Sequence, residues 1–208
     1  MLIAARYNAR FMTLADVTQV AAIEHEAFPT SWPQTAYKRE LANKLARYVV
    51  VTDESRAAPE SGPPRPRRSL FRLLKHEEEP QPTTDYIVGY VGLWLMVDEA
   101  HIVAIAVREA YRGRGLGELL LIRAIEVACE SQVDNVTLEV RRSNLVAQAL
   151  YEKYQFLKVG VRSRYYSDNH EDAIIMSTPP VHSDSYRERL DWLKDQFERK
   201  WSASDGER

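Results

Sequence analysis

A turn rich in arginine and glycine carries the clearest chemical signal in the sequence. The residues Arg112, Gly113, Arg114, Gly115, Leu116 and Gly117 follow one another, so three of the chain's eight glycines fall within five positions. Glycine lets a backbone turn tightly and lets another group approach it. Backbone N–H groups at the start of a helix bind phosphate oxygens, and the helix dipole supports that binding. The turn therefore predicts a ligand with a pyrophosphate, although a plain connection between a strand and a helix remains an alternative.

The segments on either side of this turn support that prediction. Residues 101–107 form an apolar run typical of a covered strand, and from Leu116 onward the apolar residues recur on one face of a helix. The spacing is neither that of a P-loop nor that of a dinucleotide-binding fold. We expect the ligand where this strand meets this helix.

Two further residues suggest acid–base chemistry. Glu139 lies inside an otherwise apolar run, and a carboxylate there is costly to bury unless it is used or paired, so it is a candidate general base. Tyr151, twelve positions later, can donate a proton to a departing anion. Asn144, at the predicted start of the helix that carries Tyr151, can reach toward a ligand. Tyr151 alone would be read as a core aromatic, but the combination with a phosphate turn and a base favours catalysis.

The remaining pattern predicts an α/β fold. Helices are expected over 17–28 and 34–45, after Leu116, and after Asn144. Strands are expected near 9–12, 48–51, 86–97, 101–107, 136–140, 157–164 and 173–177. Strands interleaved with helices in this way favour a mixed central sheet of about seven strands with helices on both faces.

Three segments carry less certain roles. Residues 28–33 contain Phe28 and Trp32 among prolines. These aromatic residues are expected either to pack between two helices as a hydrophobic staple or to form one wall of a substrate groove. Residues 53–85 hold six of the ten prolines and mixed charges, which predicts a disordered insertion; RNA binding by its arginines is the weaker alternative. Residues 179–208 form an extension that predicts an amphipathic helix. Its apolar stripe is expected to pack on its own domain rather than on a partner.

Bulk properties narrow the class of protein. The chain has 208 residues, a net charge of −2 and one cysteine, Cys129, so no disulfide framework is possible within it. Cys129 is more simply a small buried hydrophobe than a catalytic thiol. No run approaches the ~20 apolar residues that span a bilayer. We expect a cytoplasmic enzyme without membrane attachment, and nucleic-acid binding is disfavoured.

Five short motifs occur together in this chain. They are Ile105-Ala106-Val107, Arg112-x-x-Gly115-x-Gly117, Leu138-Glu139-Val140-Arg141-x-Ser143-Asn144, Ala149-Leu150-Tyr151-Glu152 and Asp172-Ala173-Ile174-Ile175-Met176. In combination they resemble the GCN5-related N-acetyltransferase (GNAT) superfamily, and within it the RimI-type ribosomal-protein-alanine N-acetyltransferases. The likeness covers about residues 9–52 and 86–178, so the acetyltransferase domain is predicted over 9–178.

The resemblance implies a site as well as a fold. The fourth and fifth strands would splay apart, and acetyl-CoA would lie between them as cosubstrate, with no metal. Glu139 would be the base, and Tyr151 would protonate the leaving thiolate. The residues implied in cofactor binding are Ile105, Ala106, Val107, Arg112, Gly113, Arg114, Gly115, Leu116, Gly117, Asn144 and Tyr151. Those implied in substrate binding are Phe28, Trp32, Arg164, Tyr165 and Tyr166.

The acceptor follows partly from chemistry. With pKa values near 7.8 and 10.4, an α-amine offers roughly 400 times more neutral nucleophile at pH 7 than a lysine does. This chemistry favours an α-amine, and the resemblance to the RimI type implies that the acceptor is the N-terminal alanine of a small-subunit ribosomal protein, acetylated by a monomer or weak dimer. The alternatives are a lysine or small-amine acetyltransferase on the same fold, or a non-catalytic module that binds acetyl-CoA.

Overall fold

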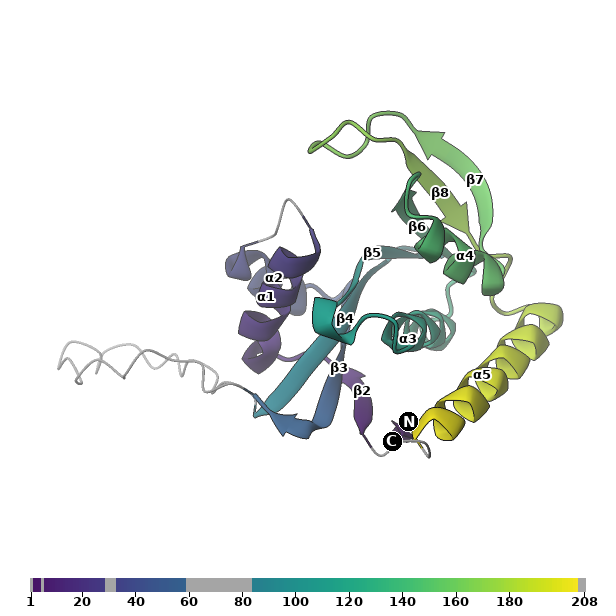
Figure 1. Ribbon diagram of the computed structural model, residues 1–208. Helices are drawn as coiled ribbons and strands as arrows, with labels where there is room; N and C mark the ends of the chain where they lie inside the picture. The colour runs from purple at the N-terminus through teal and green to yellow at the C-terminus, as the bar shows by residue number, and fades with distance from the viewer. Residues whose placement is uncertain (1, 5, 29–32, 59–83, 206–208) are drawn as a thin grey trace.

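A single mixed sheet with helices on both faces forms the molecule (Figure 1). The computed structural model describes residues 2–4, 6–28, 33–58 and 84–205. The strands are β1 (Leu2–Ala4), β2 (Tyr7–Phe11), β3 (Ala46–Ala57), β4 (Asp85–Leu95), β5 (Glu99–Val107), β6 (Asn135–Arg141), β7 (Leu157–Arg162) and β8 (Ala173–Ser177). The helices are α1 (Val17–Ala27), α2 (Gln34–Ala42), α3 (Leu116–Glu130), α4 (Leu145–Lys153) and α5 (Asp184–Asp205), with short 3-10 turns η1 (Leu14–Asp16) and η3 (Glu109–Tyr111).

The strand order is β1-β2-β3-β4-β5-β6-β8-β7. Strands β2 to β8 are the seven that the sequence predicts, and β1 adds a short eighth strand at one edge. Among the described strands, β5 and β6 form the one parallel pair. Their ladder runs from Glu99 opposite Asn135 to Ile102 opposite Leu138 and ends there, although both strands continue. The predicted splay of the fourth and fifth strands is therefore confirmed at β5 and β6.

A bulge in β5 lies next to the point where the strands separate. Leu93 of β4 pairs with Ile102, whereas the adjacent Gly92 pairs with Ala104, so Val103 is an extra residue on β5. Because a bulge reverses the alternation of side chains, Ile102 belongs to the core beneath α3 while Ala106 belongs to the core beneath α1. The backbone of β5 thus changes course at the site where the ligand was expected.

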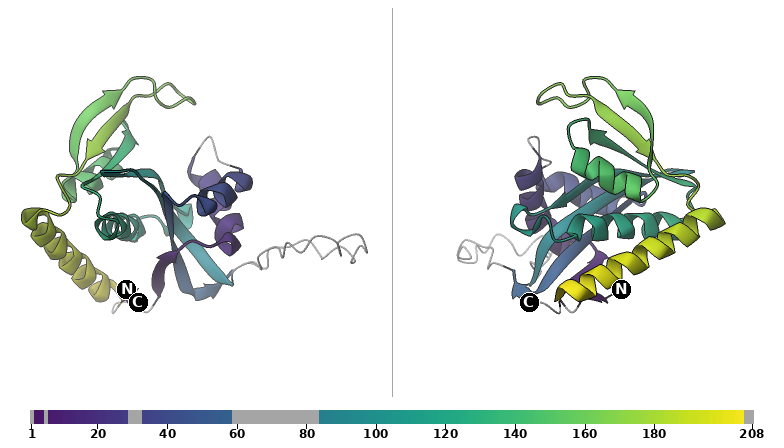
Figure 2. Two further views of the ribbon diagram at one scale, coloured as in Figure 1. Left: turned by 180° about the vertical axis from the view of Figure 1, so that it is seen from behind. Right: turned by 45° about the vertical axis from the view of Figure 1, so that its right-hand side comes forward.

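Helix α5 packs onto its own domain, as the sequence predicts. The residues of its apolar stripe, all buried, are Tyr186, Leu190, Leu193, Phe197 and Trp201. They join the core that also contains the buried face of α3. The views of Figure 2 show α5 on the α3 side, running back toward the N-terminal strand. The stripe is thus satisfied within the chain.

The predicted loop at 53–85 is wrong at its ends. Strand β3 continues to Ala57 and β4 begins at Asp85. The reason is that Asp53 is fully buried and accepts hydrogen bonds from Arg6, Ser55 and Tyr111, so this polar residue is stabilised inside the sheet. Residues 59–83 lie outside the described residues.

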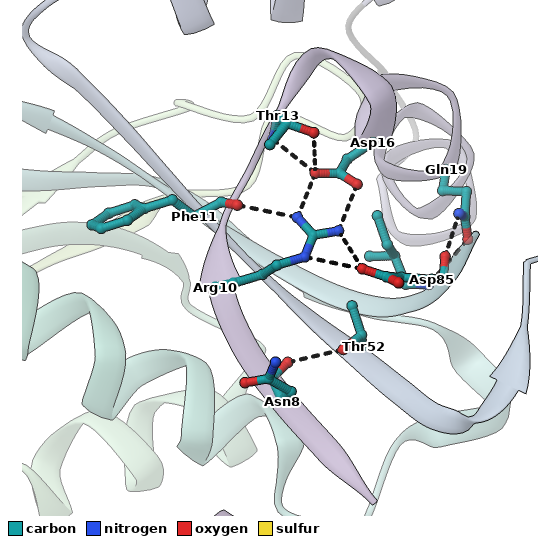
Figure 3. Close-up of polar contacts among 9 residues, drawn as sticks. Asn8, Arg10, Phe11, Thr13, Asp16, Gln19, Thr52 and Asp85 are labelled. Atoms are coloured by element: carbon teal, nitrogen blue, oxygen red, sulfur yellow. Dashed lines mark hydrogen bonds and ion pairs between the residues drawn. The ribbon is translucent and has the colours of Figure 1, made fainter. Parts of the chain in front are cut away.

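A second arginine ties the end of β2 to the starts of α1 and β4 (Figure 3). Arg10 of β2 donates to both oxygens of Asp16 at 2.7 and 2.8 Å, and its Nη2 lies 2.9 Å from Asp85 Oδ2 at the start of β4. Gln19 of α1 donates to the backbone carbonyl of Asp85 at 2.8 Å. These contacts fix α1 against the β2–β3–β4 face and so help to position the end of α1 at Phe28.

Candidate active site

Glu139 lies on β6 just beyond Leu138, the last residue of β6 that pairs with β5, and it still pairs with Ile175 of β8. Val136, Leu138 and Val140 point into the core beneath α3, so the alternation of the strand turns Glu139 to the opposite face. Its side chain is only 6% exposed. A nearly buried carboxylate therefore sits where the two parallel strands part.

Two cationic or protonatable groups contact this carboxylate. His101 Nε2 of β5 lies 2.9 Å from Glu139 Oε2, and Arg162 Nε of β7 lies 3.1 Å from Oε1. On its other side, His101 Nδ1 lies 3.0 Å from the Thr137 hydroxyl. A neutral imidazole that accepts from Thr137 can donate its Nε2–H to Glu139, which would define both the tautomer and the ring orientation.

The sequence prediction missed His101 and Arg162. His101 was read only as the first residue of an apolar strand. A correct assignment of β5 and β6 as parallel neighbours would have pointed to His101, because this pairing sets it directly beside Thr137 and two residues from Glu139. Arg162 carried no comparable signal, because its approach to Glu139 requires β7 to return beside β8.

Tyr151 is buried on α4, with its ring 5.7 Å from that of Phe156. Burial raises the pKa of Tyr151, and the nearby Tyr166 raises it further. The phenol therefore holds its proton throughout the neutral range. Burial is also the main cause that raises the pKa of Tyr166, to about 12; the charge of Arg141 lowers this pKa, and Tyr165 and Glu139 raise it.

The predicted phosphate turn connects η3 to α3. Gly113 and Gly115 have φ of 76° and 83°, a region that L side chains rarely adopt, and Gly115 is the residue that caps the start of α3. A Cβ added to Gly113 or Gly117 would meet nothing within 4 Å, so the turn is open on that side. Leu116, between them, is buried and anchors the helix start in the core.

The two arginines of the turn rest against nearby backbone. Arg112 Nε donates to the carbonyl of Val107 at 3.4 Å, and Arg114 Nη2 donates to that of Ala110 at 3.0 Å. The guanidinium of Arg114 also lies 4.8 Å from the ring centre of Tyr111. Residues 105–107, the predicted binding strand, pair with β4 on one side and lie beyond the end of the β6 ladder on the other.

Asn144 caps α4 as its type predicts. Its Oδ1 accepts from the backbone N–H of Ala147 at 3.1 Å, and the side chain is exposed. In this arrangement the amide NH2 is the part of Asn144 that is left to contact a ligand.

The β7–β8 connection carries the predicted aromatic residues. Tyr165 and Tyr166 meet edge to face at 5.2 Å, and the Arg141 guanidinium lies 3.8 Å from the ring centre of Tyr166. Arg164 has φ of 54° and its backbone N–H donates to Asp172 at 2.9 Å. The tip of this hairpin leans toward the side of the sheet that carries α1 and α2 (Figures 1 and 2).

The other predicted wall is only partly described. Phe28 ends α1, is half-buried, and packs against the core beneath α1. Trp32 lies outside the described residues. The structure therefore connects Glu139 to Tyr165 through Arg162, whose guanidinium lies 5.6 Å from the ring centre of Tyr165, and Tyr165 contacts Tyr166. The phosphate turn follows the other end of β5.

Comparison with known proteins gives the family. The model of the acetyltransferase (GNAT) family matches residues 17–156. The chain belongs to the GNAT family. It is 33% identical over 168 residues to a Bacillus subtilis protein named as a candidate ribosomal protein bS18-alanine N-acetyltransferase, with 80% of this chain and 91% of the relative covered. An N-alpha-acetyltransferase from Saccharolobus solfataricus is 42% identical over 187 residues, covering 83% and 93%.

A solved structure agrees in fold. The crystal structure of the ribosomal-protein-S18-alanine N-acetyltransferase from Escherichia coli superposes with a TM-score of 0.64 at 24% identity, covering 84% of this chain and 94% of that one. The chain is thus a GNAT N-acetyltransferase, from a family that uses acetyl-CoA. Within the described residues, no group of three or more His, Cys, Asp or Glu is arranged to hold a metal ion, and no helix is long and apolar enough to cross a membrane.

Proposed function

We propose that this GNAT protein transfers the acetyl group of acetyl-CoA to the N-terminal alanine of ribosomal protein bS18, in the cytoplasm. The observation that carries the proposal is the contact of 2.9 Å between His101 and Glu139 at the point where β5 and β6 part. It gives a buried base at the place where an amine and a thioester would meet. The candidate bS18-alanine N-acetyltransferase of Bacillus subtilis supports the choice of acceptor.

The chain offers a suitable seat for acetyl-CoA. The open side of Gly113 and Gly117 can accept pyrophosphate oxygens on backbone N–H groups at the start of α3. The backbone of Ile105 to Val107, beyond the β6 ladder, can hydrogen-bond an extended arm. Arg112, Arg114 and Leu116 shape the same turn, and the NH2 of Asn144 is free to reach the arm. Acetyl-CoA supplies an activated acetyl group as a thioester.

The protein's own residues then handle protons. Glu139 accepts a proton from the attacking α-amine, directly or through a water, and His101 orients the carboxylate. Tyr151 keeps its proton at neutral pH and donates it to the departing sulfur. Positioning of the two reactants supplies most of the rate, because the acyl group is already activated.

The acceptor enters, in this proposal, between Phe28 and the β7–β8 connection. Tyr165 and Tyr166 would contact the first residues of the peptide, and Arg164 would flank them. Trp32 is proposed for the same wall on sequence grounds. A modest carboxylate base suits an α-amine better than a lysine, since the α-amine is far less protonated at neutral pH.

An assay of CoA release tests the proposal. Two peptides are compared, one with a free N-terminal alanine and an internal lysine, the other identical but blocked at its amino terminus. We expect turnover of only the free peptide. Turnover of both would assign a lysine or broad-specificity acetyltransferase, and turnover of neither, with acetyl-CoA still bound, would favour a binding module.

A broader N-terminal acetyltransferase is the second candidate. It is favoured by the 42% identity to the archaeal N-alpha-acetyltransferase, which exceeds the identity to the Bacillus subtilis relative. Peptides that differ only in their first residue, Ala, Ser, Thr or Met, separate the two. A preference of more than about tenfold for alanine supports the bS18 assignment, and similar kcat/KM values for all four support the broader one.

A further inference from the structure

Two aromatic residues near the end of α5, Phe197 and Trp201, pack against the phosphate turn at Gly115. A Cβ added to Gly115 would come 3.2 Å from Trp201 Cζ3 and 3.5 Å from Phe197 Cε2. The two rings pack edge to face at 4.8 Å, and both side chains are buried. Gly115 thus has two reasons to be glycine: its φ of 83° and the indole that occupies the space of a side chain.

Trp201 also reaches the other end of the turn through a chain of rings. Its ring centre lies 5.8 Å from that of Tyr7, and Tyr7 lies 6.5 Å from Tyr111, both edge to face. Tyr111 directly precedes Arg112, and its hydroxyl donates to Asp53 at 3.0 Å. Trp201 therefore supports the turn directly at Gly115 and indirectly at Tyr111.

The two sides of the turn differ. On one side, Gly113 and Gly117 face open space, where the proposed function seats the pyrophosphate. On the other, Gly115 is closed by α5. An anion-binding turn binds best when its N–H groups are already held in place, because less ordering entropy is lost on binding. Packing behind the turn is a way to achieve this.

We propose that Trp201 and Phe197 are positioning residues for the cosubstrate, and that α5 acts as a brace that sets the affinity of the turn for the pyrophosphate of acetyl-CoA. The inference rests on the proposed seat of acetyl-CoA at residues 112–117. It assigns to the C-terminal extension a role in the active site, although no residue of α5 touches the ligand in this scheme.

The test compares full-length variants by calorimetry with CoA and by steady-state kinetics. Trp201→Ala removes the brace, and Phe197→Leu removes the second ring with a smaller loss of packing. Leu190→Ala is the matched control, because Leu190 is buried in the same core but lies eleven residues earlier on α5, about 16 Å along the helix. Thermal unfolding of each variant reports the purely structural effect.

We expect Trp201→Ala to raise the Kd for CoA and the KM for acetyl-CoA about tenfold, and Phe197→Leu about threefold. The KM for the acceptor peptide and kcat at saturation should change less than twofold. Leu190→Ala should lower the unfolding temperature and leave the Kd unchanged. Equal Kd values in wild type and both aromatic variants would overturn the inference, and so would an equal rise in Leu190→Ala. If wild type failed to bind CoA, the proposed function itself would fall.

Hydrogen exchange gives a readout that needs no ligand. The amides of Arg112 and Leu119, which flank the turn and donate to the carbonyls of Glu109 and Gly115 at 3.2 and 3.0 Å, should exchange faster in Trp201→Ala than in wild type, while those in the middle of α3 stay protected. Unchanged exchange in the turn would contradict the brace even if Trp201→Ala proved too unstable for kinetics, because Phe197→Leu can be measured in the same way.

Discussion

Glu139 lies where strands β5 and β6 separate, and hydrogen-bond donors on neighbouring strands hold its carboxylate in one orientation. His101 and Arg162 contact different oxygens of that carboxylate, so its orientation is fixed from two strands. A carboxylate that accepts a proton in the reaction must also be accessible to the amine. Its side chain is 6% exposed, which leaves a narrow approach, and Arg162, which contacts it, lies 5.6 Å from the ring centre of Tyr165.

Replacing Glu139 tests its role as the base. Glu139→Gln should lower kcat/KM for the free-alanine peptide about 100-fold at pH 7, because the protonated amine can no longer lose its proton to the enzyme. The defect should shrink about sevenfold, to about 15-fold, at pH 9, because the neutral fraction of an α-amine with pKa near 7.8 rises by about that factor between pH 7 and pH 9. The measurement is a pH–rate profile from 6 to 9. Glu99→Gln, beside the other nitrogen of His101, is the matched control and should stay within threefold of wild type. A pH-independent loss in Glu139→Gln would instead indicate a binding role.

Tyr151→Phe should lower kcat about 100-fold with less than a twofold change in the Kd for CoA. Because burial raises the pKa of Tyr151, the phenol stays protonated across the assay range, so this defect should be the same at pH 6 and pH 9. Tyr154→Phe removes a neighbouring hydroxyl that donates to Glu118, and it serves as the control. Full activity of Tyr151→Phe would mean that the thiolate needs no acid.

Single residues were predictable where a local rule applied. Glu139 stands out in the sequence because a charged residue in an apolar strand is unusual, and Asn144 because its type caps helices. The contacts of His101 and Arg162 with Glu139 were not predicted, because they depend on which strands become neighbours. The contact from β7 crosses twenty-three positions of sequence, and no local pattern encodes it.

Among the larger elements, the end of β3 depends on one buried ion pair. Burial alone would raise the pKa of Asp53, but hydrogen bonds from Arg6, Ser55 and Tyr111 outweigh burial and lower it from 3.8 to about 2. Since the folded pKa lies below the unfolded one, the stability gained is present above about pH 4 and is lost as the pH falls toward 2. The ion pair therefore stabilises the hairpin at neutral pH.

Asp53→Asn should lower the free energy of unfolding by about 2 kcal/mol at pH 7, from 1.36 kcal/mol per pKa unit. The difference from wild type should fall to roughly half by pH 3. Urea unfolding at pH 7, 5 and 3 measures this. Glu54→Gln changes the exposed neighbouring carboxylate and should have little effect at any pH. A gap between wild type and Asp53→Asn that stayed constant with pH would show that the charge is not what stabilises the strand.

Helices and strands were predicted correctly where the hydrophobic periodicity was strong, and their ends were misplaced where tertiary contacts determine them. The stripe of α5 fixed that helix and its buried face. The bulge at Val103 was not predictable, because an extra residue in a continuous apolar run leaves the composition of the strand unchanged. The ends of β3 and β4 were misplaced because polar residues such as Asp53 read as loop when their partners are unknown.

At the scale of the whole molecule, the strands on either side of residues 59–83 pair with each other up to the ends of that segment. Ala57 pairs with Asp85, and the N–H of Ala58 donates to the carbonyl of Thr84 at 2.8 Å. The two ends of the segment therefore leave adjacent antiparallel strands at the same point. This point lies at the end of β3 and β4 that is anchored by Arg6 and Arg10, whereas Glu139 lies on β6 on the other side of β5.

Replacing residues 59–83 with a four-residue turn that has Asn-Gly at its centre should thus leave catalysis intact. A short turn can join strands that are already paired, and shortening a connection costs little loop entropy. We expect kcat and KM for the free-alanine peptide and the Kd for CoA to stay within twofold of wild type, with an unchanged or higher unfolding temperature. A control that replaces the same residues with a Gly-Ser linker of equal length separates the effect of length from that of composition. Loss of peptide turnover in the short-turn variant alone would mean that the length of this segment matters to the site. Loss in both would assign it residues that the acceptor or cosubstrate contacts, and the catalytic unit would then extend beyond the sheet and helices described above.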